Sequence, residues 1–168
     1  MSVPVAELRQ HLQYSAWASA RLVEAASGLT EEELTHDHET ADKSVLGTLV
    51  HVFAADRHWL GRIEGNPPEK FIDPEVDMDL EVLRSQWPAL LTRWDIWLAT
   101  QTDDSIAEPL VYKDLKGREF RTPLWQIVLH VVNHGTHHRG QVSGFLRKMG
   151  HRPPAVDLIH FYRKQPPS

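Results

Sequence analysis

Four long stretches of this sequence carry apolar residues at the spacing of an amphipathic α-helix, and no other feature constrains the fold as strongly. An amphipathic helix buries its apolar stripe only against a neighbour. Four such helices therefore predict an all-α four-helix bundle, here with a short β-hairpin before the last long helix. We expect one domain over residues 1–168, because no linker divides the chain. The predicted helices run from Val5 to Ala26, from Ser44 to about Glu64, from Asp77 or Asp79 through "LEVLRSQWPALLTRWDIWLATQ", and from Thr122 to Gly150.

Local signals support these boundaries. Ser44 is a favourable N-cap, and Pro88 inside the third helix predicts either a kink or a late start of that helix. Thr122 and Pro123 predict the cap and the first turn of the last helix. Before that helix, "LVY" and "EFR" flank "KDLKG", which predicts a hairpin in which Gly117 adopts the unusual turn dihedral.

The composition limits the classes of function. The chain has no cysteine, so disulfides, thiolate metal ligands and a cysteine nucleophile are all excluded. The formal net charge is −5 and basic residues are scattered, so we expect no nucleic-acid partner and no membrane surface as partner. The N-terminus has no apolar targeting segment and no run is long enough to span a membrane, which predicts a cytoplasmic protein.

Eleven histidines are more than packing requires, and four of them lie in "IVLHVVNHGTHHRGQVSGFLRKMG", residues 127–150. On the predicted helix His134 falls at the edge of the apolar arc and His138 in its middle. Residues four apart on a helix face are neighbours, so these two imidazoles can converge on one ion. Burying both without partners would cost several kcal/mol, which a metal ion removes. Ordinary core histidines with one hydrogen bond each remain the alternative.

A metal site needs a third ligand, and the sequence offers several. His51 and His58 lie on the second predicted helix, His11 on the first, and His36 and His38 in the polar segment between them. His51 lies away from the main apolar stripe of its helix, in a sector of glycine and alanine that lets another helix approach closely. Helical geometry alone does not choose among these residues.

Two segments resemble the DinB/YfiT-like family of bacterial metal-binding four-helix bundles. They are "LGTLVHVFAADRHWLGRIEG" and "HVVNHGTHHRGQVSGFLRKMG", and the closing "PPAVDLIHFYR" extends the resemblance over nearly the whole chain. In that family one histidine of the second helix and two of the last helix, four apart, hold a divalent metal. By matching positions, the resemblance implies that His51, His134 and His138 are the ligands. It also implies a homodimer.

Three neutral imidazoles leave coordination positions open, which is typical of a reactive metal site. Zinc or nickel is the first expectation for the ion, followed by iron or manganese. The resemblance implies a transferase that uses a low-molecular-weight thiol such as bacillithiol or mycothiol, with a metal-bound thiolate attacking a small-molecule electrophile. A metal–water hydrolase is a second hypothesis, with Asp56 or Asp37 as the required carboxylate. A non-catalytic metal-binding stress-response module is the third.

Arg139 directly follows a proposed ligand. It could steady an anionic substrate, but a surface ion pair is the more ordinary expectation for an arginine on a helix. The six tryptophans are expected to fill the core or a subunit interface.

Overall fold

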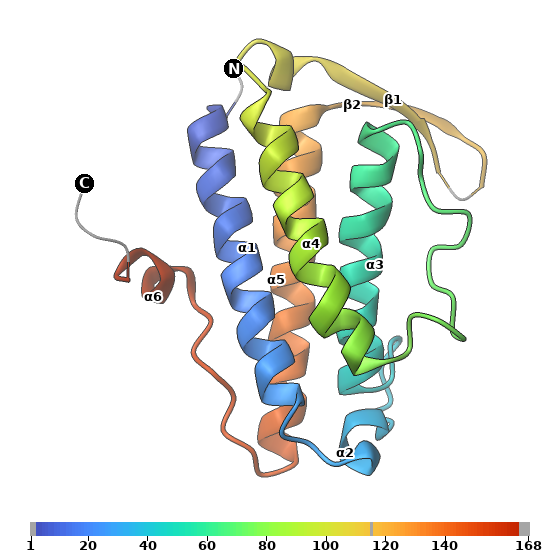
Figure 1. Ribbon diagram of the computed structural model, residues 1–168, viewed down its shortest axis with the longest axis vertical. Helices are drawn as coiled ribbons and strands as arrows, with labels where there is room; N and C mark the ends of the chain where they lie inside the picture. The colour runs from blue at the N-terminus through green and yellow to red at the C-terminus, as the bar shows by residue number, and fades with distance from the viewer. Residues whose placement is uncertain (1–2, 115, 165–168) are drawn as a thin grey trace.

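The computed structural model describes residues 3–114 and 116–164, and this part of the chain is mostly helical, with 61% helix. Four long helices run alongside one another (Figure 1). Helix α1 packs against α4 and α5, and α3 packs against the same two helices. The long helices are α1 (Val5–Ala26), α3 (Val45–Ile63), α4 (Leu80–Ala99) and α5 (Leu124–Lys148). The short elements are α2 (Glu31–Thr35), the 3-10 helix η1 (Ser105–Ala107), β1 (Pro109–Lys113), β2 (Glu119–Pro123) and α6 (Leu158–Tyr162).

Side-chain caps explain where two of the long helices begin. The Ser44 hydroxyl accepts a hydrogen bond from the Gly47 N–H at 3.0 Å, so α3 begins where the sequence predicts. The Asp79 carboxylate accepts the Glu81 N–H at 2.8 Å at the start of α4. Helix α4 continues without a break through Pro88, so the late start that the proline suggested is wrong.

The last long helix begins later than predicted. Pro123 occupies the N-cap position of α5, and Thr122 belongs to β2. The Thr122 hydroxyl lies 3.3 Å from that of Tyr112 on β1, so it forms a contact within the hairpin and does not cap the helix. The proposed Thr122 cap is therefore wrong by one position, because strand β2 extends through the residues that were assigned to the cap and the first turn.

The predicted hairpin is confirmed. Strands β1 and β2 pair antiparallel, with Tyr112 opposite Phe120, and lead directly into α5 across the ends of the long helices (Figure 1). Gly117 has a φ of 78°, the left-handed region that favours glycine. Leu115, which also belongs to the predicted turn segment, lies outside the described residues, as do residues 1–2 and 165–168 of the predicted domain.

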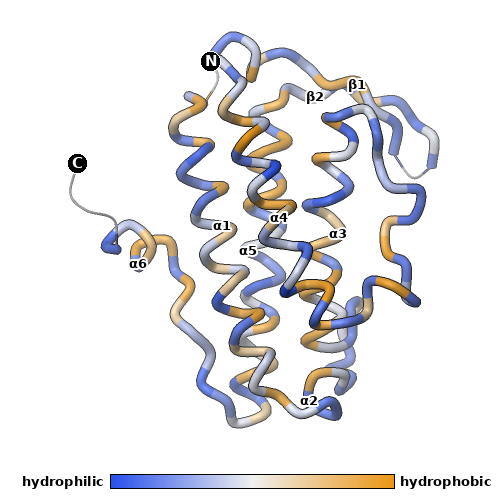
Figure 2. Tube along the Cα trace, in the orientation of Figure 1, coloured by the Kyte–Doolittle hydropathy of each residue, from blue (hydrophilic) through white to orange (hydrophobic). Residues whose placement is uncertain are grey.

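The core lies between the four long helices. Apolar residues recur between polar ones along each of them, as the hydropathy colours show (Figure 2). Trp87 and Trp94 are almost fully buried, and both donate their indole N–H to Asp56, the first to its carboxylate at 2.8 Å and the second to its backbone carbonyl at 3.1 Å. None of the helices in the described ranges is both long and apolar enough to cross a membrane.

Candidate metal centre

Three imidazoles from two adjacent helices come together between α3 and α5. His51 lies on α3, and His134 and His138 lie one turn apart on α5. One ring nitrogen from each lies within 4.8 Å of the other two. The Nε2 atoms of His51 and His134 are 3.0 Å apart, and the three ring centroids are separated by 4.5 to 4.9 Å. The structure thus places together the three residues that the family resemblance implied.

The local sequence explains this meeting. The four-residue spacing of His134 and His138 puts both rings on one face of α5. Helix α3 packs closely along α5, and small buried residues, Ala54 and Ala55, follow His51 on α3. The third ring can therefore reach the pair from the neighbouring helix.

The two rings on α5 are held in the neutral form. Burial, followed by the charges that the neighbouring imidazoles would carry, lowers the pKa of His134 to about 4. Burial also lowers the pKa of His138, although a hydrogen bond to Gln141 opposes part of this effect. Both rings are therefore neutral at pH 7, the form in which imidazole offers a lone pair to a metal ion.

In two of the three rings, a partner at the outer nitrogen determines which nitrogen faces inward. His138 Nδ1 lies 2.7 Å from the amide oxygen of Gln141. An amide oxygen only accepts, so Nδ1 carries the hydrogen and Nε2 keeps its lone pair. His51 Nδ1 lies 3.3 Å from a carboxylate oxygen of Asp42. His134 Nδ1 is buried and has no hydrogen-bond partner among the described residues.

This arrangement fits a divalent cation. Two nitrogens that are each about 2.1 Å from one tetrahedral zinc ion lie about 3.4 Å apart, and the Nε2 atoms of His51 and His134, at 3.0 Å, are only a few tenths of an ångström closer. The group contains three ligating side chains, and over residues 3–114 and 116–164 no fourth joins it. An ion held here would keep at least one coordination position for an exogenous molecule.

Aromatic side chains surround the three imidazoles. The Phe71 ring lies 5.5 Å from that of His51, and the His130 ring lies 5.8 Å from that of His134. Phe71 belongs to the segment 64–79, which Arg57 holds against α3 by donating to the Phe71 carbonyl and to both carboxylate oxygens of Asp77. The surroundings of the site are thus partly apolar and are anchored by a part-buried ion pair.

The other histidines considered as a third ligand lie elsewhere. His11 Nδ1 lies 2.8 Å from the Glu7 carbonyl of its own helix. His38 stacks on Phe145, with ring centroids 4.1 Å apart, and His36 packs edge-on against His38. His58 lies beyond Phe71, with its ring centroid 5.7 Å from the phenylalanine ring.

The carboxylate that approaches the rings is not one of the two expected. Asp56 is 2% exposed and its carboxylate accepts the Trp87 indole N–H in the core. Asp37 accepts the Glu39 backbone N–H in its own loop. Asp42 lies beside the rings instead, and sequence reasoning missed it. Its position two residues before the N-cap of the helix that carries His51 was the only signal available.

Arg139 does not form the surface ion pair that was expected. It is 1% exposed, and its guanidinium donates hydrogen bonds to the hydroxyls of Ser15 at 2.9 Å and Ser19 at 3.2 Å on α1. A third hydrogen bond reaches Thr136 at 3.0 Å. Gly135 makes room for it, because a Cβ there would lie 2.6 Å from a guanidinium nitrogen. Arg139 therefore ties α5 to α1 and is not placed to bind a substrate anion.

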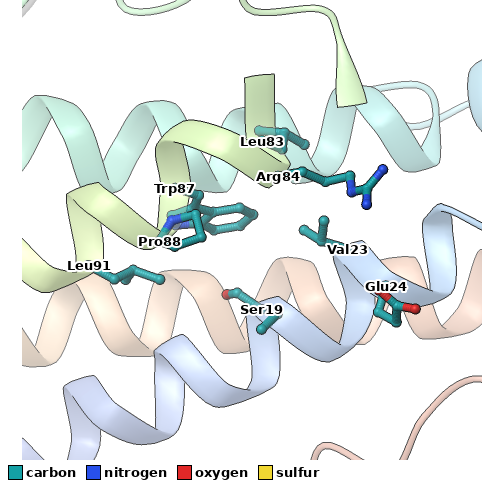
Figure 3. Close-up of a pocket in the computed structure, with 9 residues that line it drawn as sticks. Ser19, Val23, Glu24, Leu83, Arg84, Trp87, Pro88 and Leu91 are labelled. Atoms are coloured by element: carbon teal, nitrogen blue, oxygen red, sulfur yellow. The ribbon is translucent and has the colours of Figure 1, made fainter. Parts of the chain in front are cut away.

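A cavity of about 190 Å³ opens on a different side of the molecule, between α1 and α4 (Figure 3). Val23, Leu83 and Leu91 give it a largely apolar lining, and Ser19 and Trp87 form part of its wall. None of the three clustered imidazoles contributes to its lining, so it is separate from the candidate metal centre.

A sequence model of the DinB family matches residues 1–167. The chain belongs to the DinB family. Protein DinB of Bacillus subtilis (strain 168) is similar to this DinB-family chain, with 23% identity over 152 residues that cover 86% of this chain and 87% of that protein. The crystal structure of a DinB-like protein from Bacillus cereus ATCC 10987 superimposes with a TM-score of 0.64 at 21% identity, covering 88% of this chain and 95% of that one. That likeness shows a shared fold.

Proposed function

We propose that this DinB-family protein holds one divalent metal ion through His51, His134 and His138 and transfers a low-molecular-weight thiol to a small electrophile. One observation carries the proposal: three imidazoles converge from two helices without a fourth ligand within the part of the chain that the structure describes. Such a set suits a reactive site better than a closed structural site. Zinc or nickel is the first candidate for the ion, and iron or manganese follows.

When bound, the ion supplies a Lewis-acidic centre that lowers the pKa of a small thiol. The residues of the chain account for the remaining requirements. The neutral rings leave the charge of the cation undiminished, and Phe71 offers an apolar wall beside His51 for the organic part of a substrate. The chain has no cysteine of its own, so the sulfur has to come from a cosubstrate. In the reaction the sulfur–carbon bond forms as the leaving group departs with its electron pair, and the thiol proton passes to solvent.

The position of Asp42 favours thiol transfer over hydrolysis. A metal–water hydrolase that uses a carboxylate as general base would have it on the open side of the ion, beside the water to be activated. Asp42 lies instead at the outer nitrogens, Nδ1 of His51 and Nδ1 of His138. Asp56 and Asp37 are engaged elsewhere. A thiol ionises more readily than water, so a thiol transferase has no need of such a base.

The proposal has further parts that rest on the family resemblance and on charge. They are a four-helix-bundle class for the four long helices, a homodimer, a cytoplasmic location and a small-molecule substrate. A net charge of −5 supports a protein without a nucleic-acid or membrane partner. Sedimentation of the purified protein tests the dimer directly.

The experiment is elemental analysis of the purified protein beside His134→Ala and His138→Ala, with His11→Ala as the matched control. The wild type and the control should carry close to one divalent ion per chain, and the two variants should carry none. Equal metal content in all four proteins would overturn the site.

Turnover of monochlorobimane with bacillithiol or mycothiol then tests the chemistry. Thiol-dependent product from the metal-loaded protein, lost in His134→Ala, supports the transferase. Cleavage of esters without thiol would mean hydrolysis. Metal binding with no turnover in either assay would leave the non-catalytic module.

A further inference from the structure

We infer that Asp42 is a positioning residue that orients two of the three imidazoles, those of His51 and His138. This inference rests on the proposed metal site. Its Oδ1 lies 3.3 Å from Nδ1 of His51 on α3, and its Oδ2 lies 3.5 Å from Nδ1 of His138 on α5. The Asp42 side chain is 18% exposed, so solvent screens these contacts only in part. A single carboxylate thus spans the junction between the two helices that supply the ligands.

The contacts select the useful form of each ring. A carboxylate only accepts hydrogen bonds, so its charge favours the tautomer with hydrogen on Nδ1 and leaves the lone pair on Nε2. The Gln141 amide oxygen acts on His138 in the same direction, at 2.7 Å from Nδ1. A negative charge behind neutral ligands also stabilises a cation in front of them. Carboxylates behind metal-binding histidines commonly serve in this way.

The loop that carries Asp42 adopts an unfavourable backbone to place it there. Glu39 and Lys43 have φ values of 60° and 61°, the left-handed region that residues other than glycine rarely adopt. Backbone hydrogen bonds from His38 N–H to the Lys43 carbonyl and from Lys43 N–H to the Thr40 carbonyl close the loop. Strained residues on both sides of one side chain are typical of a segment that serves a site.

Gly47 allows this loop to pack closely against α3. A Cβ at that position would lie 2.2 Å from the Asp42 backbone oxygen, so only glycine lets residue 42 rest against the first turn of α3. Gly47 and His51 are four residues apart and therefore share one face of the helix. The close approach at Gly47 brings the Asp42 carboxylate to the imidazole one turn further along.

A plainer role for Asp42 is to stabilise the N-terminus of α3, because a negative charge interacts favourably with the helix dipole there. That role would change stability alone. It would not change which nitrogen of His51 carries hydrogen, and it would not distinguish Asp42 from another carboxylate near the same end of the molecule. The two roles therefore differ in two measurable quantities.

The first measurement is zinc affinity, by competition with a chromophoric chelator, for wild type, Asp42→Asn and Glu32→Gln. Asp42→Asn keeps the shape but removes the charge and one acceptor, and we expect zinc binding to weaken by about 10- to 100-fold. Glu32 is exposed on α2, so Glu32→Gln removes one charge from a neighbouring element and should stay within about twofold of wild type. Gly47→Ala keeps the carboxylate but displaces it, and should weaken zinc binding in the same direction.

The second measurement uses the metal-free proteins. Long-range proton–nitrogen NMR of the imidazoles at neutral pH should show hydrogen on Nδ1 of His51 in the wild type, and a smaller share of that tautomer in Asp42→Asn. Circular dichroism confirms that each variant is folded. This measurement needs no bound metal, so it tests the effect of Asp42 on the imidazoles separately from the metal site.

Unchanged zinc affinity and an unchanged tautomer in Asp42→Asn would overturn the inference. Equal losses of zinc affinity in Asp42→Asn and Glu32→Gln would also overturn it. The loss would then come from the change in net charge and not from the position of Asp42. A wild type that binds no zinc but shows the expected tautomer change would remove the proposed function and leave Asp42 as a partner of the rings.

Discussion

His138 and Arg139 are neighbours in the chain, yet they enter two polar regions of opposite character. The first region is the imidazole cluster between α3 and α5, in which Nε2 atoms from two helices approach to 3.0 Å. The second lies in the core, where the Arg139 guanidinium donates to hydroxyls of α1 and α5 and Asp56 accepts an indole N–H. Both regions place polar groups among apolar ones, at positions where most proteins would have apolar side chains.

The two regions differ in where their polar groups find partners. Arg139 has three hydroxyl contacts, and the Tyr14 ring lies 5.4 Å from its guanidinium carbon. In the cluster, the inner nitrogens face one another and His134 Nδ1 has no partner within the described ranges. The two terminal guanidinium nitrogens of Arg139 are hydrogen-bonded to hydroxyls and hold α5 to α1, although its buried Nε has no partner among the described residues. The imidazole nitrogens of the cluster face a common point instead, where they can bind an ion. Changes in the two regions should therefore have opposite consequences.

The largest effect on stability should come from Arg139→Ala. The change removes three hydrogen bonds, opens space beside Gly135, and removes the positive charge that lowers the pKa of the buried Asp56 carboxyl. We expect the free energy of unfolding to fall by about 3–5 kcal/mol, measured by urea denaturation. The folded fraction should still bind one zinc ion per chain. Arg147→Ala, an exposed position on the same helix, is the control and should cost less than about 1 kcal/mol. Equal effects of the two changes would contradict the division into two regions.

Asp56 should make stability depend on pH. Burial raises the pKa of its carboxyl to about 7, despite the indole hydrogen bond and Arg139, which act in the opposite direction. The folded protein then keeps a proton that the unfolded chain releases near pH 4, so stability falls as pH rises between these two values. At about 1.4 kcal/mol per pH unit, the loss approaches about 4 kcal/mol and is complete above pH 7.

The variant Asp56→Asn isolates this effect, because an amide keeps an acceptor for Trp87 but does not titrate. The difference in the free energy of unfolding between wild type and variant should fall from pH 4 to pH 7 and then level off. Urea denaturation in the presence of a chelator measures it without a contribution from bound metal. A difference that is constant with pH would mean that Asp56 is ionised throughout.

Zinc should stabilise the wild type through the imidazole cluster. A ligand that binds only the folded state at about 100 times its Kd raises the free energy of unfolding by about 2.7 kcal/mol. We expect a corresponding rise in Tm for wild type and for His11→Ala, and no rise for His134→Ala. A chelator should reverse the rise. If zinc stabilised His134→Ala as much as wild type, the ion would bind elsewhere.

Much of the fold could be predicted because its signals are local. The periodicity of the long helices, the Ser44 cap and the turn at Gly117 each depend on a few consecutive residues, and the structure confirms them. The spacing of His134 and His138 is local in the same sense. The choice of His51 as the third ligand does not follow from local sequence, and it came only from the family resemblance.

The residues that were misjudged depend on contacts between distant segments. Arg139 falls outside the single apolar stripe of its helix, but α5 packs against both α1 and α3, so more than one of its faces is buried. Asp42 reaches the rings only because residues on both sides of it adopt left-handed backbone and Gly47 admits the loop. A helical wheel contains neither kind of information. Both misjudged residues are polar, and polar groups depend most on their exact partners.

The smallest predicted effect separates the contributions within the cluster itself. Gln141→Ala removes the acceptor at 2.7 Å from His138 Nδ1 but leaves the Asp42 carboxylate at 3.5 Å from the same atom. We expect zinc affinity to fall by about tenfold, or about 1.4 kcal/mol, measured by chelator competition. Gln126→Ala, exposed on the same helix, should leave affinity unchanged.

The comparison of Gln141→Ala with Asp42→Asn is the sharper test. Gln141 supports one ring, whereas Asp42 faces two rings from two helices, so the aspartate variant should lose more affinity. The double variant should lose less than the product of the two single losses, because both residues act on His138 Nδ1. Fully multiplicative losses would mean that the two side chains support separate rings. Asp42 would then act through His51 alone, and the link between α3 and α5 would lie in the imidazoles and not in the carboxylate behind them.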